Sequence, residues 1–399
     1  MQLDKKYEWG EGVFTLLSWF KKDKVKKARV LVAGAGALGN EVVKDLALFG
    51  VGHIYVVDFD QIEISNLTRS VLFREEDAYC HSYKAEIVAK RAMEINPQIK
   101  VTPIVGNLFS EVGLGLYSTV DVVIGCLDSR LARYLLNRLC MRAGKTWIDG
   151  SIENLTGAVK VYTPGINCYE CGLSREEFNI IMLRTGCADV VRTQSFAGRV
   201  ATTPISASII GAMQVQEAMK IIHLDSDDKS QFKTLQGKML RYEGMTNSMN
   251  IYKYSSWKKN CPAHERWENV VKGKDLSATM TVKTAMEELK SLLNVKALEI
   301  NMRNNKFIDK ITSEKPEKEF KVMIPESKLD DYIRKDSELR KLSIRTVFHK
   351  SFYENIDADF PYKNLSLQQI GIPPFDVLQV ATEKGRFYVE LSGDSNLFI

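Results

Sequence analysis

A glycine-rich stretch early in the chain has the residue types and the spacing that bind phosphate groups. Gly34, Gly36 and Gly39 fit the pattern G-x-G-x-x-G. Such glycines permit a tight turn and let a phosphate approach the free N–H groups at a helix N-terminus, where the helix dipole favours anions. Asp58 follows about 20 residues later, where an acid commonly binds ribose hydroxyls. The stretch predicts a nucleotide site but does not choose between NAD and ATP, and the alternative is that the glycines only allow close helix–sheet packing.

Two further polar residues favour ATP over a redox cofactor. Asn66 and Arg69 come just after the acidic segment Asp58-Phe59-Asp60. A hydride-transfer enzyme has no need of an amide and a guanidinium at this place. Both side chains suit the oxygens of a triphosphate, and Arg can bind them through two parallel hydrogen bonds.

The elements that must position these residues alternate between strand and helix. Apolar stretches predict strands, and the segments between them predict helices, one of which Pro97 ends. This order is typical of an α/β fold with a doubly wound, mainly parallel, Rossmann-like sheet. The expected strands are 28–32, 54–58, 100–105, 120–127 and 146–150, and the expected helices are 40–49, 84–95, 130–143 and 205–222.

The chain divides into three parts by its pattern. Residues 1–28 predict a short helical lead, and residues 29–270 predict the main domain. A polar segment, Lys272-Gly273-Lys274, is interpreted as a linker to a small C-terminal α+β module over 275–399. Within that module, a strand is expected at Leu342–Phe348.

The composition is that of an ordinary soluble globular protein. The chain has 399 residues, of which 26% are charged and 45% hydrophobic, and its formal net charge is +5. This weak excess of positive charge does not indicate nucleic-acid binding. We expect no signal peptide and no membrane span, since no apolar run approaches the ~20 residues that a span needs. Seven cysteines are an odd number, which favours a reducing cytoplasm over a disulfide framework.

Four residues of metal-binding types occur in two closely spaced pairs. Cys168-x-x-Cys171 and Cys261-x-x-His264 both have the spacing of Zn²⁺ ligands. Three cysteines and one histidine form an accepted structural zinc set, so the pairs predict a zinc knuckle. The alternative is a group of thiols without metal.

In combination, these motifs resemble the adenylation domain of the ubiquitin-activating enzyme superfamily. That superfamily includes the sulfur-carrier adenylyltransferases of thiamine and molybdopterin synthesis and the bacterial activating enzymes of ubiquitin-like proteins. The resemblance runs from Arg29 to His223, and the phrase Asn66-Leu-Thr-Arg-Ser-Val-Leu-Phe-Arg74 is especially similar to the activating enzymes of ubiquitin-like systems. The segments that carry it are Asp58-Phe-Asp60-Gln-Ile-Glu-Ile-Ser-Asn66-Leu-Thr-Arg69, Lys84 and Cys126-Leu-Asp128-Ser.

The resemblance implies that a carboxylate attacks the α-phosphorus of ATP and that pyrophosphate leaves. Negative charge then develops on phosphate oxygens, and catalysis depends on positioning and electrostatic stabilisation. Arg69 and Lys84 would neutralise this charge, and Asn66 would hydrogen-bond a phosphate oxygen. The alternative for Arg69 is a surface ion pair.

Three acids complete the implied site. Asp58 would hold the ribose, Asp60 would shape the same edge, and Asp128 would bind Mg²⁺ together with phosphate and water ligands. The alternative for Asp128 is a cap on the helix that begins near Arg130.

Cys187 stands where relatives place the cysteine that forms a thioester or persulfide, and arginines near it in the sequence would favour its thiolate. The alternative is a non-reactive loop cysteine. Cys80 is the second candidate for reactivity, whereas Cys126 and Cys140 are expected to be buried.

The implied function is ATP-dependent activation of a ubiquitin-like protein at its C-terminal glycine, followed by thioester formation on Cys187 and transfer to a conjugating enzyme. By analogy of position, the C-terminal module could recruit that enzyme. Relatives are usually dimers, so a homodimer is expected. The alternatives are a sulfur-carrier adenylyltransferase and a catalytically inactive partner subunit. Only one observation favours the inactive subunit: no arginine precedes Arg29. Either Lys5 or Lys6 replaces the arginine that relatives carry there, or its role is absent.

Overall fold

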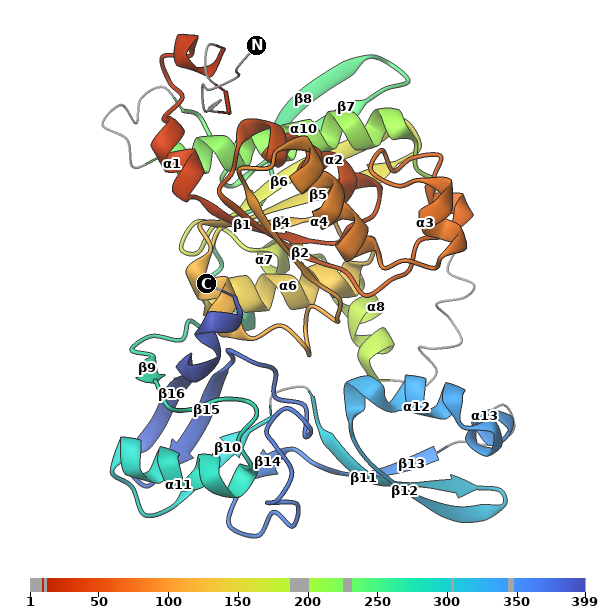
Figure 1. Ribbon diagram of the computed structural model, residues 1–399, viewed down its shortest axis with the longest axis vertical. Helices are drawn as coiled ribbons and strands as arrows, with labels where there is room; N and C mark the ends of the chain where they lie inside the picture. Colours follow the sequence, from red (N-terminus) through yellow and green to blue (C-terminus); the bar gives the residue numbers. More distant parts are fainter. Residues whose placement is uncertain are drawn as a thin grey trace, which may run out of the picture. The chain divides into compact units, whose positions relative to one another are not determined.

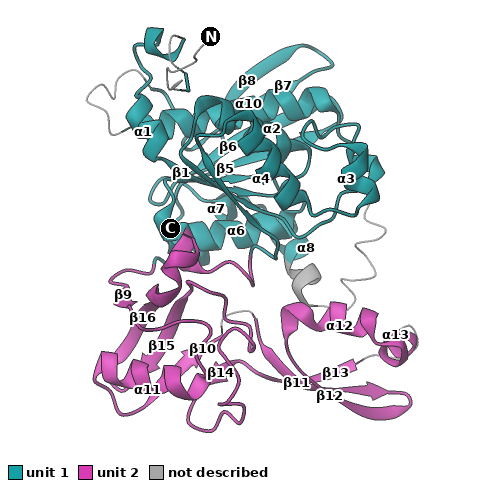
Figure 2. Cartoon of the chain, in the orientation of Figure 1, with its two compact units in different colours: residues 1–108, 117–266 teal, residues 109–116, 267–399 magenta. Residues whose placement is uncertain are grey.

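The chain is described as a computed structural model, which divides into two compact units (Figures 1 and 2). One unit holds residues 1–108 and 117–266, and the other holds residues 109–116 and 267–399. For residues 182–186 only the backbone is described. The described residues are 9–10, 13–186, 201–224, 232–302, 305–343 and 348–398.

An eight-stranded sheet forms the centre of the first unit, in the order β3-β2-β1-β4-β5-β6-β7-β8. The first five strands in this order are parallel to one another. The pairs β5–β6, β6–β7 and β7–β8 are antiparallel. The strands are β1 Arg29–Ala33, β2 His53–Val57, β3 Lys100–Ile104, β4 Val122–Gly125, β5 Trp147–Glu153, β6 Thr156–Tyr162, β7 Lys238–Glu243 and β8 Ser248–Lys253.

Helices cover both faces of this sheet (Figure 1). On one face, α2, α4 and α10 bury aliphatic side chains against the strands, while α6 lies on the other face. The predicted doubly wound, Rossmann-like α/β fold is therefore confirmed. The helices are α1 Lys22–Lys27, α2 Ala37–Phe49, α3 Glu75–Tyr79, α4 Lys84–Ile95, α5 Leu114–Thr119, α6 Arg130–Arg142, α7 Tyr169–Gly172, α8 Arg175–Gly186 and α10 Pro204–His223.

The second unit has two small sheets. A five-stranded sheet has the order β14-β10-β15-β16-β9, and a three-stranded sheet has the order β12-β11-β13. The strands are β9 Val271–Gly273, β10 Leu298–Asn301, β11 Phe307–Glu314, β12 Glu317–Pro325, β13 Phe348–Tyr353, β14 Asn355–Ile356, β15 Val377–Thr382 and β16 Gly385–Leu391, and the helices are α11 Val282–Leu293, α12 Leu329–Lys335 and α13 Ser337–Ser343.

Two local predictions for the C-terminal module are wrong. The expected linker at Lys272-Gly273-Lys274 falls largely within β9, which pairs parallel with β16 as an edge strand. The expected strand at Leu342–Phe348 begins instead as the end of helix α13, because Leu339 is 1% exposed in a small core and fixes that turn as helix. The strand β13 starts only at Phe348.

The second unit also takes a segment from the middle of the chain. The N–H of Leu114 donates to Asp376 Oδ1 at 2.8 Å, and the N–H of Gly115 donates to the Phe375 carbonyl at 2.9 Å. A Cβ on Gly113 would lie 2.3 Å from the Pro374 carbonyl, so only glycine allows this approach. The predicted boundaries at 28, 270 and 275 remain predictions. No helix in the described parts of the chain is both long and apolar enough to cross a membrane.

Candidate functional site

The predicted nucleotide-binding residues follow the carboxyl ends of β1, β2 and β4. In a parallel sheet these ends lie at the same edge, which we call the carboxyl edge. The glycine turn follows β1, Asp58 and Asp60 follow β2, and Asp128 follows β4.

The three glycines of the turn have different roles. Gly34 has φ +100°, and a Cβ there would lie 2.5 Å from the Cys126 carbonyl oxygen, while a Cβ on Gly39 would lie 2.1 Å from the Gly34 carbonyl oxygen. Close packing therefore explains these two glycines. Gly36 has φ −74°, and a Cβ there would meet nothing within 4 Å. Neither backbone conformation nor packing requires glycine at this position, so the open space over Gly36 fits a bound group.

That open space lies at the N-terminus of α2. Gly36 is the N-cap, no side chain caps the helix, and its first turn has no acidic residue. The first N–H groups of a helix have no partner within the helix, and together with the dipole they attract an anion. The end of α2 can therefore hold a phosphate.

Asp58 joins the glycine turn to the end of β2. Its Oδ2 accepts from the Ala35 N–H at 2.7 Å, and its Oδ1 accepts from the Asp60 N–H at 2.8 Å. Burial raises the pKa of Asp58 above its ordinary value, and the two N–H bonds and the nearby Lys84 charge oppose that shift. Both oxygens retain lone pairs, so the carboxylate can still accept from a ligand hydroxyl.

Lys84 and Asp60 lie together at this edge. Lys84 Nζ donates to Asp60 Oδ2 at 2.7 Å, and the Lys84 N–H donates to the Asp60 carbonyl at 2.9 Å. The side chain of Lys84 is 12% exposed, whereas that of Asp60 is 52% exposed. The structure thus places the lysine at the start of α4, partly buried beside a carboxylate.

Asn66 and Arg69 lie in and just after a short 3-10 turn at Ile64–Asn66. Asn66 Oδ1 accepts from the Glu63 N–H at 3.0 Å, which holds the turn and leaves the amide nitrogen as the donor. Arg69 Nη1 donates to the Ser65 carbonyl at 2.7 Å. Among the described residues Arg69 has no carboxylate partner, so the alternative of a surface ion pair finds no support.

Asp128 is exposed, and its side chain has no hydrogen bond to a described residue. The alternative that Asp128 caps α6 is wrong, because the N-cap is Ser129, whose Oγ accepts from the Ala132 N–H at 3.1 Å. The Cys126 N–H donates to the Ala33 carbonyl at 2.8 Å, which fixes the loop before Asp128 against the glycine turn. A carboxylate with a fixed backbone and an exposed side chain suits Mg²⁺, which takes few protein ligands.

No sequence motif identifies Arg133, which supports this loop. Its Nη2 donates to the Leu127 carbonyl at 2.6 Å and its Nε donates to Asp149 Oδ1 at 2.7 Å. The side chain of Asp149 is 1% exposed. An acid inside an apolar strand needs a cationic or hydrogen-bonding partner, and that signal could have predicted such a residue.

The second predicted site, which we call the Cys/His cluster, also assembles. Its ligand atoms all lie within 4.8 Å of one another. Cys168 Sγ lies 3.8 Å from Cys261 Sγ, and a tetrahedron with Zn–S bonds of about 2.3 Å has an edge of about 3.8 Å. Cys171 Sγ lies 3.2 Å from His264 Nε2. The members are Cys168, Cys171, Cys261 and His264.

The surroundings of the cluster fit a cation. The Cys171 N–H donates to Cys168 Sγ, and the Lys258 N–H donates to Cys171 Sγ, both at 3.3 Å. Burial raises the pKa of the Cys168 and Cys261 thiols and lowers the pKa of His264. Imidazole is therefore in the neutral form that binds metals, whereas the thiols need a cation to become thiolates.

The other cysteines divide as follows. Cys187 lies outside the described residues. Cys80 is exposed and Cys140 is fully buried. Cys126 is partly exposed as a residue and packs against the core, but its thiol is buried. Burial raises the pKa of the Cys126 and Cys140 thiols, which makes both weak nucleophiles.

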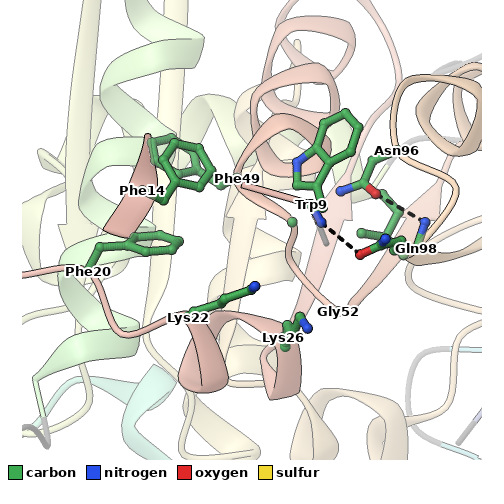
Figure 3. A pocket seen from close by; sticks show the side chains of 11 residues that line it. Trp9, Phe14, Phe20, Lys22, Lys26, Phe49, Gly52, Asn96 and Gln98 are labelled. Atoms are coloured by element: carbon green, nitrogen blue, oxygen red, sulfur yellow. Dashed lines mark hydrogen bonds between the residues drawn. The ribbon is translucent and has the colours of Figure 1, made fainter. Parts of the chain in front are cut away.

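A pocket of about 260 Å³ lies at the opposite end of β2 from Asp58 (Figure 3). Trp9, Phe14 and Phe49 form its apolar wall, and Asn96 and Gln98 line its polar side. None of the predicted site residues lines it.

Comparison with known proteins gives one family and several relatives. The family model of the ThiF family matches residues 14–263. SUMO-activating enzyme subunit uba-2 of Caenorhabditis elegans is 36% identical over 157 residues, which cover 39% of this chain and 27% of that protein. Adenylyltransferase and sulfurtransferase MOCS3 of Culex quinquefasciatus is 32% identical over 241 residues, or 60% of this chain and 50% of that protein.

The chain thus spans half or less of the length of these two relatives. Among solved structures, E. coli MccB with ATP is similar, with 24% identity and a TM-score of 0.49 over 61% of this chain and 68% of that chain.

Proposed function

Because the chain belongs to the ThiF family, we propose that it is an ATP-dependent adenylyltransferase that activates the C-terminal glycine of a ubiquitin-like protein. The observation that carries this proposal is the open space over Gly36 at the uncapped N-terminus of α2. A phosphate there lies at the same edge of the sheet as Asp58 and Asp128. The names of the relatives, a SUMO-activating enzyme subunit and an adenylyltransferase, support the same reading.

In the proposed reaction, a carboxylate oxygen of the carrier's C-terminal glycine attacks the α-phosphorus of ATP. The bond between the α-phosphorus and its bridging oxygen breaks, and pyrophosphate leaves with the electron pair. Asp58 binds the ribose, Asn66 and Arg69 bind phosphate oxygens, and Lys84 adds positive charge after exchanging its contact with Asp60 for the phosphate. Asp128 would hold Mg²⁺, which would neutralise charge at the phosphates.

The later steps depend in part on residues that are not described, among them Cys187. In the proposal, a thiolate of Cys187 attacks the acyl carbon of the adenylate, AMP leaves, and the thioester passes to a conjugating enzyme recruited by the module at 275–399. A homodimer is part of the proposal, and Lys5 or Lys6 would take the place of the arginine that relatives carry near the N-terminus. A structural Zn²⁺ on the Cys/His cluster is also part of it, supported by the 3.8 Å separation of Cys168 and Cys261 sulfurs.

Two alternatives remain. The similarity to MOCS3 over 60% of this chain favours a sulfur-carrier adenylyltransferase. The similarity to a SUMO-activating enzyme subunit favours a partner subunit that binds the carrier without activating it.

One experiment separates these three functions. The protein is incubated with candidate carriers, ATP and Mg²⁺, and ATP–pyrophosphate exchange is measured together with an adduct that dithiothreitol removes. Exchange with an adduct is the expected result, while exchange without an adduct favours the sulfur-carrier function. No exchange with any carrier favours the inactive subunit, and exchange that survives Arg69→Ala would contradict the proposed site.

A further inference from the structure

Asn40, in the first turn of α2, connects two parts of the carboxyl edge that are far apart in the sequence. Its Nδ2 donates to the carbonyls of Ala35 at 2.9 Å and Gly36 at 3.0 Å, both in the glycine turn. Its Oδ1 accepts from the N–H of Leu72 at 2.9 Å. The Asn40 side chain is fully buried, so water cannot replace these bonds.

Leu72 belongs to the segment that begins with Arg69. In this segment, Ser70, Leu72 and Phe73 are 4 to 5% exposed, whereas Arg69 is partly exposed. The segment is therefore anchored in the core while the guanidinium remains accessible. Asn40 supplies the polar connection between this anchor and the glycine turn.

We propose that Asn40 is a positioning residue that holds the Arg69 segment in register with the glycine turn. The inference rests on the proposed function, in which Arg69 and the N-terminus of α2 bind the same triphosphate. Two groups bind one ligand well only if their separation is fixed before the ligand arrives, because a loose segment must be ordered at a cost in free energy. Neither Asn40 nor Leu72 touches the ligand in this account.

Asn40→Ser removes the bond to Leu72 but can keep a bond to the Gly36 carbonyl. A serine hydroxyl in a helix can bond the carbonyl four residues earlier, here that of Gly36, but it is too short to replace the amide that reaches Leu72. The matched control is Asn96→Ser. Asn96 is also fully buried, donates to the Ala47 carbonyl at the other end of α2, and accepts from the Gln98 N–H, yet it lines the pocket of Figure 3 and not the carboxyl edge.

The first readout is amide hydrogen exchange of a peptide that contains Leu72, which needs no activity. We expect faster exchange of this peptide in Asn40→Ser at a denaturant concentration where the protein is folded, and unchanged exchange in Asn96→Ser. Unchanged protection of the peptide in Asn40→Ser would overturn the proposal.

The second readout is a double-mutant cycle with Arg69→Ala. Asn40→Ser should lower kcat/KM for ATP in pyrophosphate exchange about tenfold, or about 1.4 kcal/mol, but less than about twofold when Arg69 is already alanine. Additive effects of the two substitutions would overturn the proposal, because a merely structural role of Asn40 does not depend on Arg69.

The two proposals fail in different ways. If the wild-type protein shows no pyrophosphate exchange with any of the carriers tested, the proposed function fails. The affinity for Mg²⁺·ATP measured by calorimetry then replaces kcat/KM in the double-mutant cycle. An affinity that Asn40→Ser leaves unchanged would overturn the positioning role.

Discussion

The Cys/His cluster and the carboxyl edge are two binding regions of one unit, built in opposite ways. The cluster brings together ligand pairs that are 93 residues apart in the sequence, and their sulfur and nitrogen atoms contact one another directly. At the carboxyl edge, polar side chains bond mainly to nearby backbone groups, and Asp128 points into solvent. A metal at the cluster would therefore join segments that are distant in the sequence, whereas a ligand at the carboxyl edge would bind side chains that local backbone bonds already hold.

This difference predicts that substitutions in the cluster reduce stability and that substitutions at the carboxyl edge reduce activity. The largest expected effect is that of Cys171→Ser in the cluster. Loss of one thiolate should remove the proposed zinc ion and lower the free energy of unfolding by about 5 kcal/mol. This decrease is a fraction of the ~10–16 kcal/mol that zinc binding supplies in zinc-finger peptides. Mass spectrometry measures the zinc content of the variant, and thermal unfolding measures its stability.

Cys140→Ser is the control for this substitution, since Cys140 is also buried but lies outside the cluster. It should keep its zinc and lose only the ~1–3 kcal/mol expected for a buried hydroxyl. Less than half an equivalent of zinc in the purified wild-type protein would show that the cluster is a group of thiols without metal.

Arg69→Ala should have the next largest effect, and it should fall on activity. Removal of one preorganised electrostatic group typically costs about 10²–10³ in rate, or ~3–4 kcal/mol of transition-state stabilisation. Thermal unfolding should change little, because the guanidinium bonds only to the Ser65 carbonyl among the described residues. Pyrophosphate exchange and a melting curve on the same sample test this.

Arg91→Ala is a suitable comparison for Arg69→Ala. Arg91 on α4 pairs with Glu76, Asp77 and Glu94, and among the described residues no ion pair joins it to the carboxyl edge. Its removal should leave the rate of pyrophosphate exchange within about twofold of the wild-type rate and lower the free energy of unfolding by at most about 1 kcal/mol. If both substitutions slow exchange equally, the effect of Arg69 is a general one of surface charge.

The smallest expected effect comes from Gly36→Ala, and it tests whether the carboxyl edge is built for a ligand. A Cβ at Gly36 enters open space, so stability should change by less than about 1 kcal/mol. The same methyl group would lie in the path of a phosphate, and we expect the Kd for Mg²⁺·ATP to rise about tenfold, or ~1.4 kcal/mol. Calorimetry and chemical denaturation measure the two quantities.

Gly39→Ala should show the opposite pattern. Its Cβ would lie 2.1 Å from the Gly34 carbonyl oxygen, so the backbone must move, at a cost of about 1–3 kcal/mol in stability. Unchanged ATP affinity in Gly36→Ala would mean that the open space over this glycine has no role in binding.

The sequence by itself determined the parts that depend on near neighbours. The glycine turn between β1 and α2, the order of strands and helices, and the family follow from residue types at short spacings, because local backbone conformation decides them. The two ligand pairs of the Cys/His cluster were also recognisable, since each pair has its own spacing.

Only the tertiary structure decided which distant groups became partners. The bonds of Asn40 to Leu72 and of Arg133 to Asp149 join segments that the fold brings side by side, and no local pattern specifies them. The same holds for β9, which is a strand because β16 lies next to it, and for residues 109–116, which pack in the second unit. A buried polar group must find a partner wherever the topology supplies one, so its partner becomes known only when the chain has folded.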